Sequence, residues 1–168
     1  LSREQSKQNY DGDTSFQIGK IEMVTNTGTY IDCPFHRFAD GNDTAQTALK
    51  SFAQLDAVMI HIWFTETLKI TEDHLKNREI RNRAVLIQTG WDRHWNTELY
   101  YQDHPYLTEQ AAMYLRDCNV KLVGIDSHNI DDTAGRTRPV HTVLLGAGIL
   151  IVEHLCNLNK LPDQNFKF

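Results

Sequence analysis

The amino-acid sequence predicts a single α/β domain with a mixed, largely buried β-sheet. Short apolar runs rich in β-branched residues recur along the chain, amphipathic segments lie between them, and 168 residues fit one domain. The apolar runs have the length of buried strands. They cover residues 57–64, 84–89, 121–126 and 149–153.

Local signals predict the remaining elements. Partial alternation of apolar residues over 15–24 predicts a first strand. Thr71 is a good N-cap for a short acidic helix, and Thr108 is a good N-cap for a longer helix that continues to Cys118. Residues 139–145 predict a further short helix, which glycines end.

The composition argues against several classes of function. The formal net charge is −5 and there is no lysine or arginine run, which argues against a nucleic-acid or anionic-membrane surface. No apolar run approaches the roughly 20 residues of a membrane span. The three cysteines are odd in number and far apart, so we expect a reducing, cytoplasmic location. They are Cys33, Cys118 and Cys156.

Both ends of the chain look like the middle of a longer sequence. The chain begins at Leu1 without a methionine, and residues 166–168 resemble the opening of a strand. We therefore expect that residues 1–168 form one domain that is truncated at both ends.

The stretch from Asn26 to His36 combines a carboxylate and an imidazole with a glycine and a proline that restrict the backbone. Gly28 permits a positive φ, and Pro34 fixes its own φ and favours an extended residue before it. In an extended segment, Tyr30 and Asp32 share one face, and a histidine just past the corner can approach the carboxylate. An aspartate and a histidine in such a turn more often have a purely structural role, so this pattern alone does not establish a site.

A long aromatic stretch covers residues 90–107, where a segment of this length without regular structure is uncommon unless it is functional. Its large rings suit either the wall of a pocket for a flat ligand or a contact between subunits. They belong to Trp91, Trp95, Tyr100, Tyr101 and Tyr106.

Acidic and histidine side chains from distant segments form a candidate metal site. Glu153 ends an apolar run, where an unpaired buried carboxylate is costly, so we expect it to have a partner. His141 lies twelve residues earlier, across a helix and a glycine turn. With Asp32 and His36 these residues give two carboxylates and two imidazoles, a ligand set suited to Zn²⁺ or Mn²⁺. Asp126, at the end of another strand, is either a ligand-facing group or a cap.

The central stretch resembles the signature of the metal-dependent cyclase/kynurenine formamidase family, His-x-Gly-Thr-His-x-Asp-x-Pro-x-His. The matching positions are Gly28, Thr29, Asp32, Pro34 and His36, and later matches are Gly124-Ile125-Asp126, His141 and Glu153. The resemblance covers residues from about 15 to 160. It implies a swivelling β/β/α sandwich, amide hydrolysis by metal-activated water, a small-molecule substrate and a homo-oligomer.

Two positions depart from that signature, because Asn26 and Tyr30 stand where the family has histidine ligands. An amide oxygen is a weak ligand, and a phenol rarely coordinates Zn²⁺. The resemblance therefore leaves two alternatives, one divalent ion on Asp32, His141 and Glu153, or no ion.

Three hypotheses for function follow. The first is a hydrolase of an amide or related carbonyl compound, with His36 as general base and proton donor and Tyr30 donating to the oxyanion. The second is a non-catalytic protein on the same scaffold, which binds a small aromatic ligand or assembles with other subunits. The third is a metal-free hydrolase that uses Asp32 and His36, with Cys33 as its nucleophile.

Overall fold

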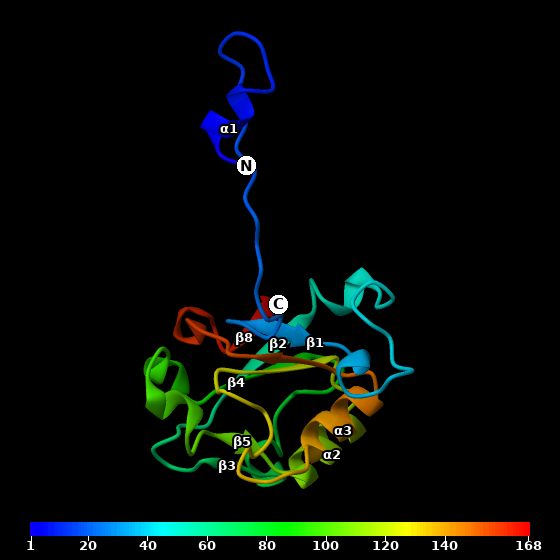
Figure 1. The fold of residues 1–168 in the computed structure, drawn as a ribbon. Helices are drawn as coiled ribbons and strands as arrows, with labels where there is room; N and C mark the ends of the chain where they lie inside the picture. The colour runs from blue at the N-terminus through cyan, green and yellow to red at the C-terminus, as the bar shows by residue number, and fades with distance from the viewer.

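The computed structural model describes residues 1–168, and its centre is a six-stranded sheet (Figure 1). The strand order is β1-β7-β6-β4-β2-β8. The bounds are β1 (Tyr30–Asp32), β2 (Asp56–His61), β4 (Ala84–Gln88), β6 (Leu122–Ile125), β7 (Leu150–Glu153) and β8 (Gln164–Lys167). β3 (Lys69–Ile70) and β5 (Tyr106–Leu107) form a separate two-stranded sheet.

The main sheet is mixed, as the sequence predicts. β2, β4, β6 and β7 run parallel to one another, whereas β1 and β8 pair antiparallel at the two edges. Every residue of β4 and β6 is buried, which explains why these strands are continuous apolar runs rather than alternating ones. β1 pairs only with β7, so one side of β1 is a free edge of the sheet.

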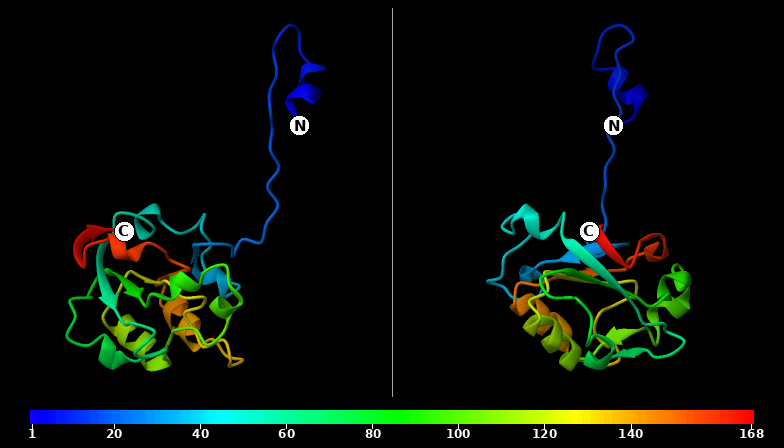
Figure 2. Two further views of the ribbon diagram at one scale, coloured as in Figure 1. Left: turned by 90° about the vertical axis from the view of Figure 1, so that its left-hand side faces the viewer. Right: turned by 180° about the vertical axis from the view of Figure 1, so that it is seen from behind.

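Two helices, α2 (Glu109–Asp117) and α3 (Pro139–Gly146), cover one face of the sheet (Figures 1 and 2). The larger part of the core lies between them and the strands. α2 begins at Thr108, whose side chain accepts a hydrogen bond from the Ala111 backbone N–H at 3.1 Å, as expected for an N-cap. A smaller apolar cluster covers the opposite face, where Leu155 and Leu158 pack against β4, β6 and β7.

The predicted strand over residues 15–24 is wrong. The chain leaves the body of the molecule before β1, and a short helix, α1 (Arg3–Lys7), lies at the far end of this arm (Figures 1 and 2). The apolar side chains of the arm are exposed, with Ile21 at 85%. Alternation predicts a strand only where a neighbouring strand and a core exist, and within this chain the arm has neither.

Other differences are smaller. The helix predicted after Thr71 is a single 3-10 turn, Glu72–His74. The aromatic stretch contains two more such turns and β5, and it buries Trp91 and Tyr100. No helix has both the length and the apolar character needed to cross a bilayer.

Candidate active site

The pairing of β1 with β7 brings three of the predicted residues together. The antiparallel register places Tyr30 opposite Glu153 and Asp32 opposite Ile151. Directly paired side chains lie on the same face of a sheet, so Tyr30, Asp32 and Glu153 share one face. The Tyr30 hydroxyl donates a hydrogen bond to Oε2 of Glu153, and Oε1 of the same carboxylate accepts one from the Ile130 N–H at 2.7 Å.

The chain corner after β1 positions His36 as expected. Gly28 has φ of +69°, and Cys33 is extended before Pro34, which begins a 3-10 turn that ends at His36. A Cβ atom at Gly41 would lie 2.6 Å from the carbonyl carbon of Pro34, so only glycine permits the chain to pack against this corner. As a result, Nδ1 of His36 lies 3.3 Å from Oδ1 of Asp32.

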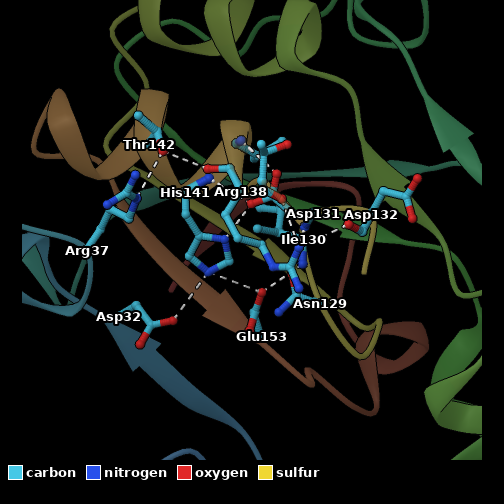
Figure 3. A network of polar contacts seen from close by, with 12 residues as sticks. Asp32, Arg37, Asn129, Ile130, Asp131, Asp132, Arg138, His141, Thr142 and Glu153 are labelled. Carbon is cyan, nitrogen blue, oxygen red and sulfur yellow. Dashed lines mark hydrogen bonds and ion pairs between the residues drawn. The ribbon is translucent and has the colours of Figure 1, made fainter. Parts of the chain in front are cut away.

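His141 approaches from the first turn of α3, and Asp131 orients it. Asp131 accepts hydrogen bonds from the backbone N–H groups of Val140 at 2.8 Å and His141 at 3.0 Å, and from Nδ1 of His141 at 2.6 Å. The other ring nitrogen, Nε2, therefore points toward the sheet. It lies 3.7 Å from Oδ2 of Asp32 and 3.7 Å from Oε1 of Glu153 (Figure 3).

The electrostatics of this cluster are those of a buried acidic site. Burial lowers the pKa of His141, but hydrogen bonds to the nearby aspartates and the charge of Glu153 outweigh this effect and raise the pKa to about 9. Burial raises the pKa of Glu153, against the opposing effects of His141 and Tyr30. Burial and the adjacent carboxylate also raise the pKa of Tyr30, so its phenol remains a hydrogen-bond donor.

The residues present fit one divalent metal ion. Oδ2 of Asp32 is buried and has no hydrogen-bond partner, which is uncommon for a carboxylate oxygen. One ligand atom each from Asp32, His36 and His141 lies within 4.8 Å of the others, and Glu153 borders the same space. Carboxylate oxygen and neutral imidazole nitrogen are the donors that Zn²⁺ and Mn²⁺ accept, and an imidazole held at Nδ1 by a carboxylate is a common arrangement around such ions.

Asp126 lies outside this group, since no hydrogen bond or ion pair joins it to the other four residues. Its carboxylate accepts hydrogen bonds from Thr89 N–H, Thr89 Oγ1 and Gly90 N–H, at 2.6 to 3.0 Å. Burial raises the pKa of Asp126 to about 6. These contacts correspond to the cap that the sequence allowed, because they hold the turn that follows β4.

Sequence reasoning did not assign Asp131, although it is buried and contacts His141 directly. It lies in the polar run that follows β6, at the carboxyl end of a parallel strand, where ligand-binding groups gather in open α/β sheets. This position at the end of a strand is the signal in the sequence that could have identified Asp131.

Comparison with known proteins identifies the family. Residues 2–132 match the profile of the family described as "Cyclase: Putative cyclase". The chain belongs to this family. It is 33% identical over 143 residues to a kynurenine formamidase of Geobacillus thermodenitrificans, a match that covers 84% of this chain and 66% of that protein. A kynurenine formamidase of Bacillus cytotoxicus is 28% identical over 153 residues, which cover 91% of this chain and 71% of the relative.

Solved structures of putative cyclase relatives share the fold. A potential metal-dependent hydrolase with cyclase activity superposes with a TM-score of 0.75 at 26% identity, over 88% of this chain and 70% of the other. Isatin hydrolase A from Labrenzia aggregata gives a TM-score of 0.77 at 22% identity, over 88% and 67%, which concerns the fold alone. This chain spans about two thirds of the length of these relatives. The relatives support the predicted class, a hydrolase of carbon–nitrogen bonds.

Proposed function

We propose that this putative cyclase hydrolyses an amide or lactam bond of a small molecule with the help of one divalent ion. Asp32, His141 and Glu153 would hold the ion, either Zn²⁺ or Mn²⁺. The observation that carries the proposal is the unpartnered Oδ2 of Asp32, buried beside Nε2 of His141. A buried carboxylate with a free oxygen and an imidazole pointed toward it form an incomplete coordination sphere.

When bound, such an ion would polarise the substrate carbonyl and make a water molecule more acidic. The chain itself would handle the protons. The His36 side chain is 44% exposed at the mouth of the cluster, so it can reach both a water molecule and the leaving nitrogen. Asp32, 3.3 Å from Nδ1 of His36, orients the ring, as expected for a general base held by a carboxylate.

One cavity adjoins the cluster, and a second lies beyond Tyr30, on the side of His154. The first, of about 340 Å³, includes Asp32 and His36 in its wall. The second, of about 240 Å³, lies beside Trp95, Tyr100 and His154. Aromatic walls with few polar groups favour an aromatic ligand. A larger hollow of about 560 Å³ contains none of the clustered residues, so size alone does not locate the site.

The test is the substitution His36→Ala in metal-loaded protein, assayed with aromatic formamides and lactams. We expect kcat to fall by roughly 10²–10⁴-fold, the usual contribution of a general acid–base, with an unchanged melting temperature. His61→Ala is the matched control, because His61 is exposed and pairs with Asp163 away from the cluster. Unchanged turnover in His36→Ala would reject the role. Protein with neither metal nor turnover that an aromatic ligand nevertheless stabilises would favour the binding hypothesis.

We also propose that the protein is a cytoplasmic homo-oligomer and that its arm, residues 1–24, contacts a second copy of the chain. The arm carries exposed apolar side chains and makes hydrogen bonds only within residues 1–27. Exposed apolar side chains gathered on one segment are typical of a protein interface. The free thiols of the three cysteines suit a reducing compartment. The exposed apolar side chains of the arm are Leu1, Tyr10, Phe16, Ile18, Ile21, Met23 and Val24.

A further inference from the structure

The two oxygens of Glu153 face different partners. Oε1 lies 3.7 Å from Nε2 of His141 and is on the side where an ion would lie. Oε2 accepts the hydrogen bond of the Tyr30 hydroxyl. Because the Tyr30 phenol occupies Oε2 and the Ile130 N–H already donates to Oε1, the carboxylate can face a cation only through the remaining lone pair of Oε1.

The place beside Oε2 is also filled by the Tyr30 ring. This ring lies 5.3 Å, centre to centre, from the imidazole of His154, so an aromatic layer continues outward from Glu153. A neutral phenol donates a proton to a carboxylate but is a poor ligand for a divalent ion. On this side of Glu153 the chain therefore offers a hydrogen-bond donor where a second ion would require a ligand.

Two buried carboxylates face the place where an ion would lie. Asp131 accepts hydrogen bonds from Nδ1 of His141 and from two backbone N–H groups, so Asp32 and Glu153 are the two buried carboxylates that face Nε2 of His141. One divalent cation neutralises both. Within this cluster Oδ2 of Asp32 is the one buried side-chain atom without a hydrogen-bond partner, and it faces the same Nε2 of His141 that Oε1 of Glu153 faces.

We infer that Tyr30 is a positioning residue that limits the site to one divalent ion and fixes Glu153 for that ion. The inference rests on the proposed function, because it presumes that the cluster binds a metal. It replaces the oxyanion role that the sequence suggested for Tyr30, since the single hydroxyl proton is already given to Glu153.

The experiment measures Mn²⁺ bound per chain, by calorimetric titration and elemental analysis, in the full chain and in two variants. We expect one ion in the unchanged protein. In Tyr30→Phe, Glu153 loses its donor, so we expect one ion bound about 10-fold more weakly, as is usual when a group that orients a ligand is removed. In Tyr30→His, an imidazole nitrogen replaces the hydroxyl beside Oε2, so we expect two ions.

Electron paramagnetic resonance gives a readout independent of turnover. Isolated Mn²⁺ in the unchanged protein should give a resolved six-line signal, whereas paired ions in Tyr30→His should give a broadened, coupled one. Tyr101→His is the matched control, because Tyr101 is exposed and contacts none of the clustered residues, and it should bind one ion.

Each alternative outcome has a distinct meaning. Two ions in the unchanged protein would overturn the inference and leave the proposed function standing. No ion in the unchanged protein would overturn the proposed metal-dependent function itself. A single ion in folded Tyr30→His would show that Tyr30 does not limit the site to one ion. An unaltered affinity in Tyr30→Phe would show that Tyr30 does not fix Glu153. The Tyr30→Phe arm keeps the test decisive if the histidine variant does not fold.

Discussion

Replacement of Asp131 by asparagine should weaken metal binding without removing any proposed ligand. In the unchanged chain Oδ2 of Asp131 accepts hydrogen bonds from the backbone N–H and from Nδ1 of His141 (Figure 3). An asparagine can keep its oxygen on the Val140 N–H, but its amide group then presents N–H bonds to two donors. His141 would escape this conflict by moving its proton to Nε2, the nitrogen that faces Asp32 and Glu153.

The magnitude follows from the contacts that are lost. Loss of a carboxylate that orients a metal-bound histidine typically costs 10- to 100-fold in affinity, which is about 1.4–2.7 kcal/mol. Because Asp131 is fully buried, the unpaired donors should also lower the free energy of unfolding, by roughly 1–3 kcal/mol. The two effects share one cause, so they should appear together in the same variant.

The assay is a competition titration with a chromophoric chelator, alongside chemical denaturation without metal. Asp132→Asn is the matched control, since Asp132 is exposed and its carboxylate accepts only the Ala134 N–H, at 2.9 Å. This control should bind metal like the unchanged protein. If folded Asp131→Asn bound metal with unaltered affinity, the orientation of His141 by Asp131 would be irrelevant to the site and the reasoning would be refuted.

Two further predictions concern stability and assembly. Burial and the neighbouring His128 and His104 lower the pKa of His154 to about 4, so the unfolded chain binds a proton at higher pH than the folded chain. Stability should therefore fall as pH drops from about 6.5 to 4, by ~1–2 kcal/mol after allowance for solvent screening of a half-buried ring, and His154→Gln should flatten this part of a urea-denaturation profile. An equally steep loss in the variant would assign the effect to other groups. Replacement of Ile18 and Ile21 by serine should shift the protein toward monomers in light scattering after size-exclusion chromatography, and an unchanged mass would exclude the arm from the interface.

Much of the sheet could be predicted because its signals are local. The apolar runs at β4, β6 and β7 are short, β-branched and bounded by glycine or polar residues, so their length and burial follow from sequence alone. The corner at Pro34 was equally readable, since glycine and proline restrict the backbone wherever they occur. The conformation of the arm could not be predicted in the same way. Its alternating apolar residues have no neighbouring strand within this chain, and alternation alone does not say whether such a strand exists.

The candidate site was only partly predictable for a similar reason. Asp32 and His36 lie four residues apart around a rigid corner, so their approach was foreseeable. The approach of His141 to Glu153 depends on the β1–β7 register and on the capping of α3 by Asp131, and both are tertiary contacts. The role of Asp126 could not be decided from the sequence, because a carboxylate at a strand end is as suited to capping a neighbouring turn as to binding a ligand.

The most direct test of the account is anomalous X-ray diffraction from crystals grown with Mn²⁺ or Zn²⁺. The account predicts one anomalous peak per chain, within bonding distance of Oδ2 of Asp32, Nε2 of His141 and Oε1 of Glu153. A peak at another place, or fully ordered side chains with no peak among them at saturating metal, would contradict it.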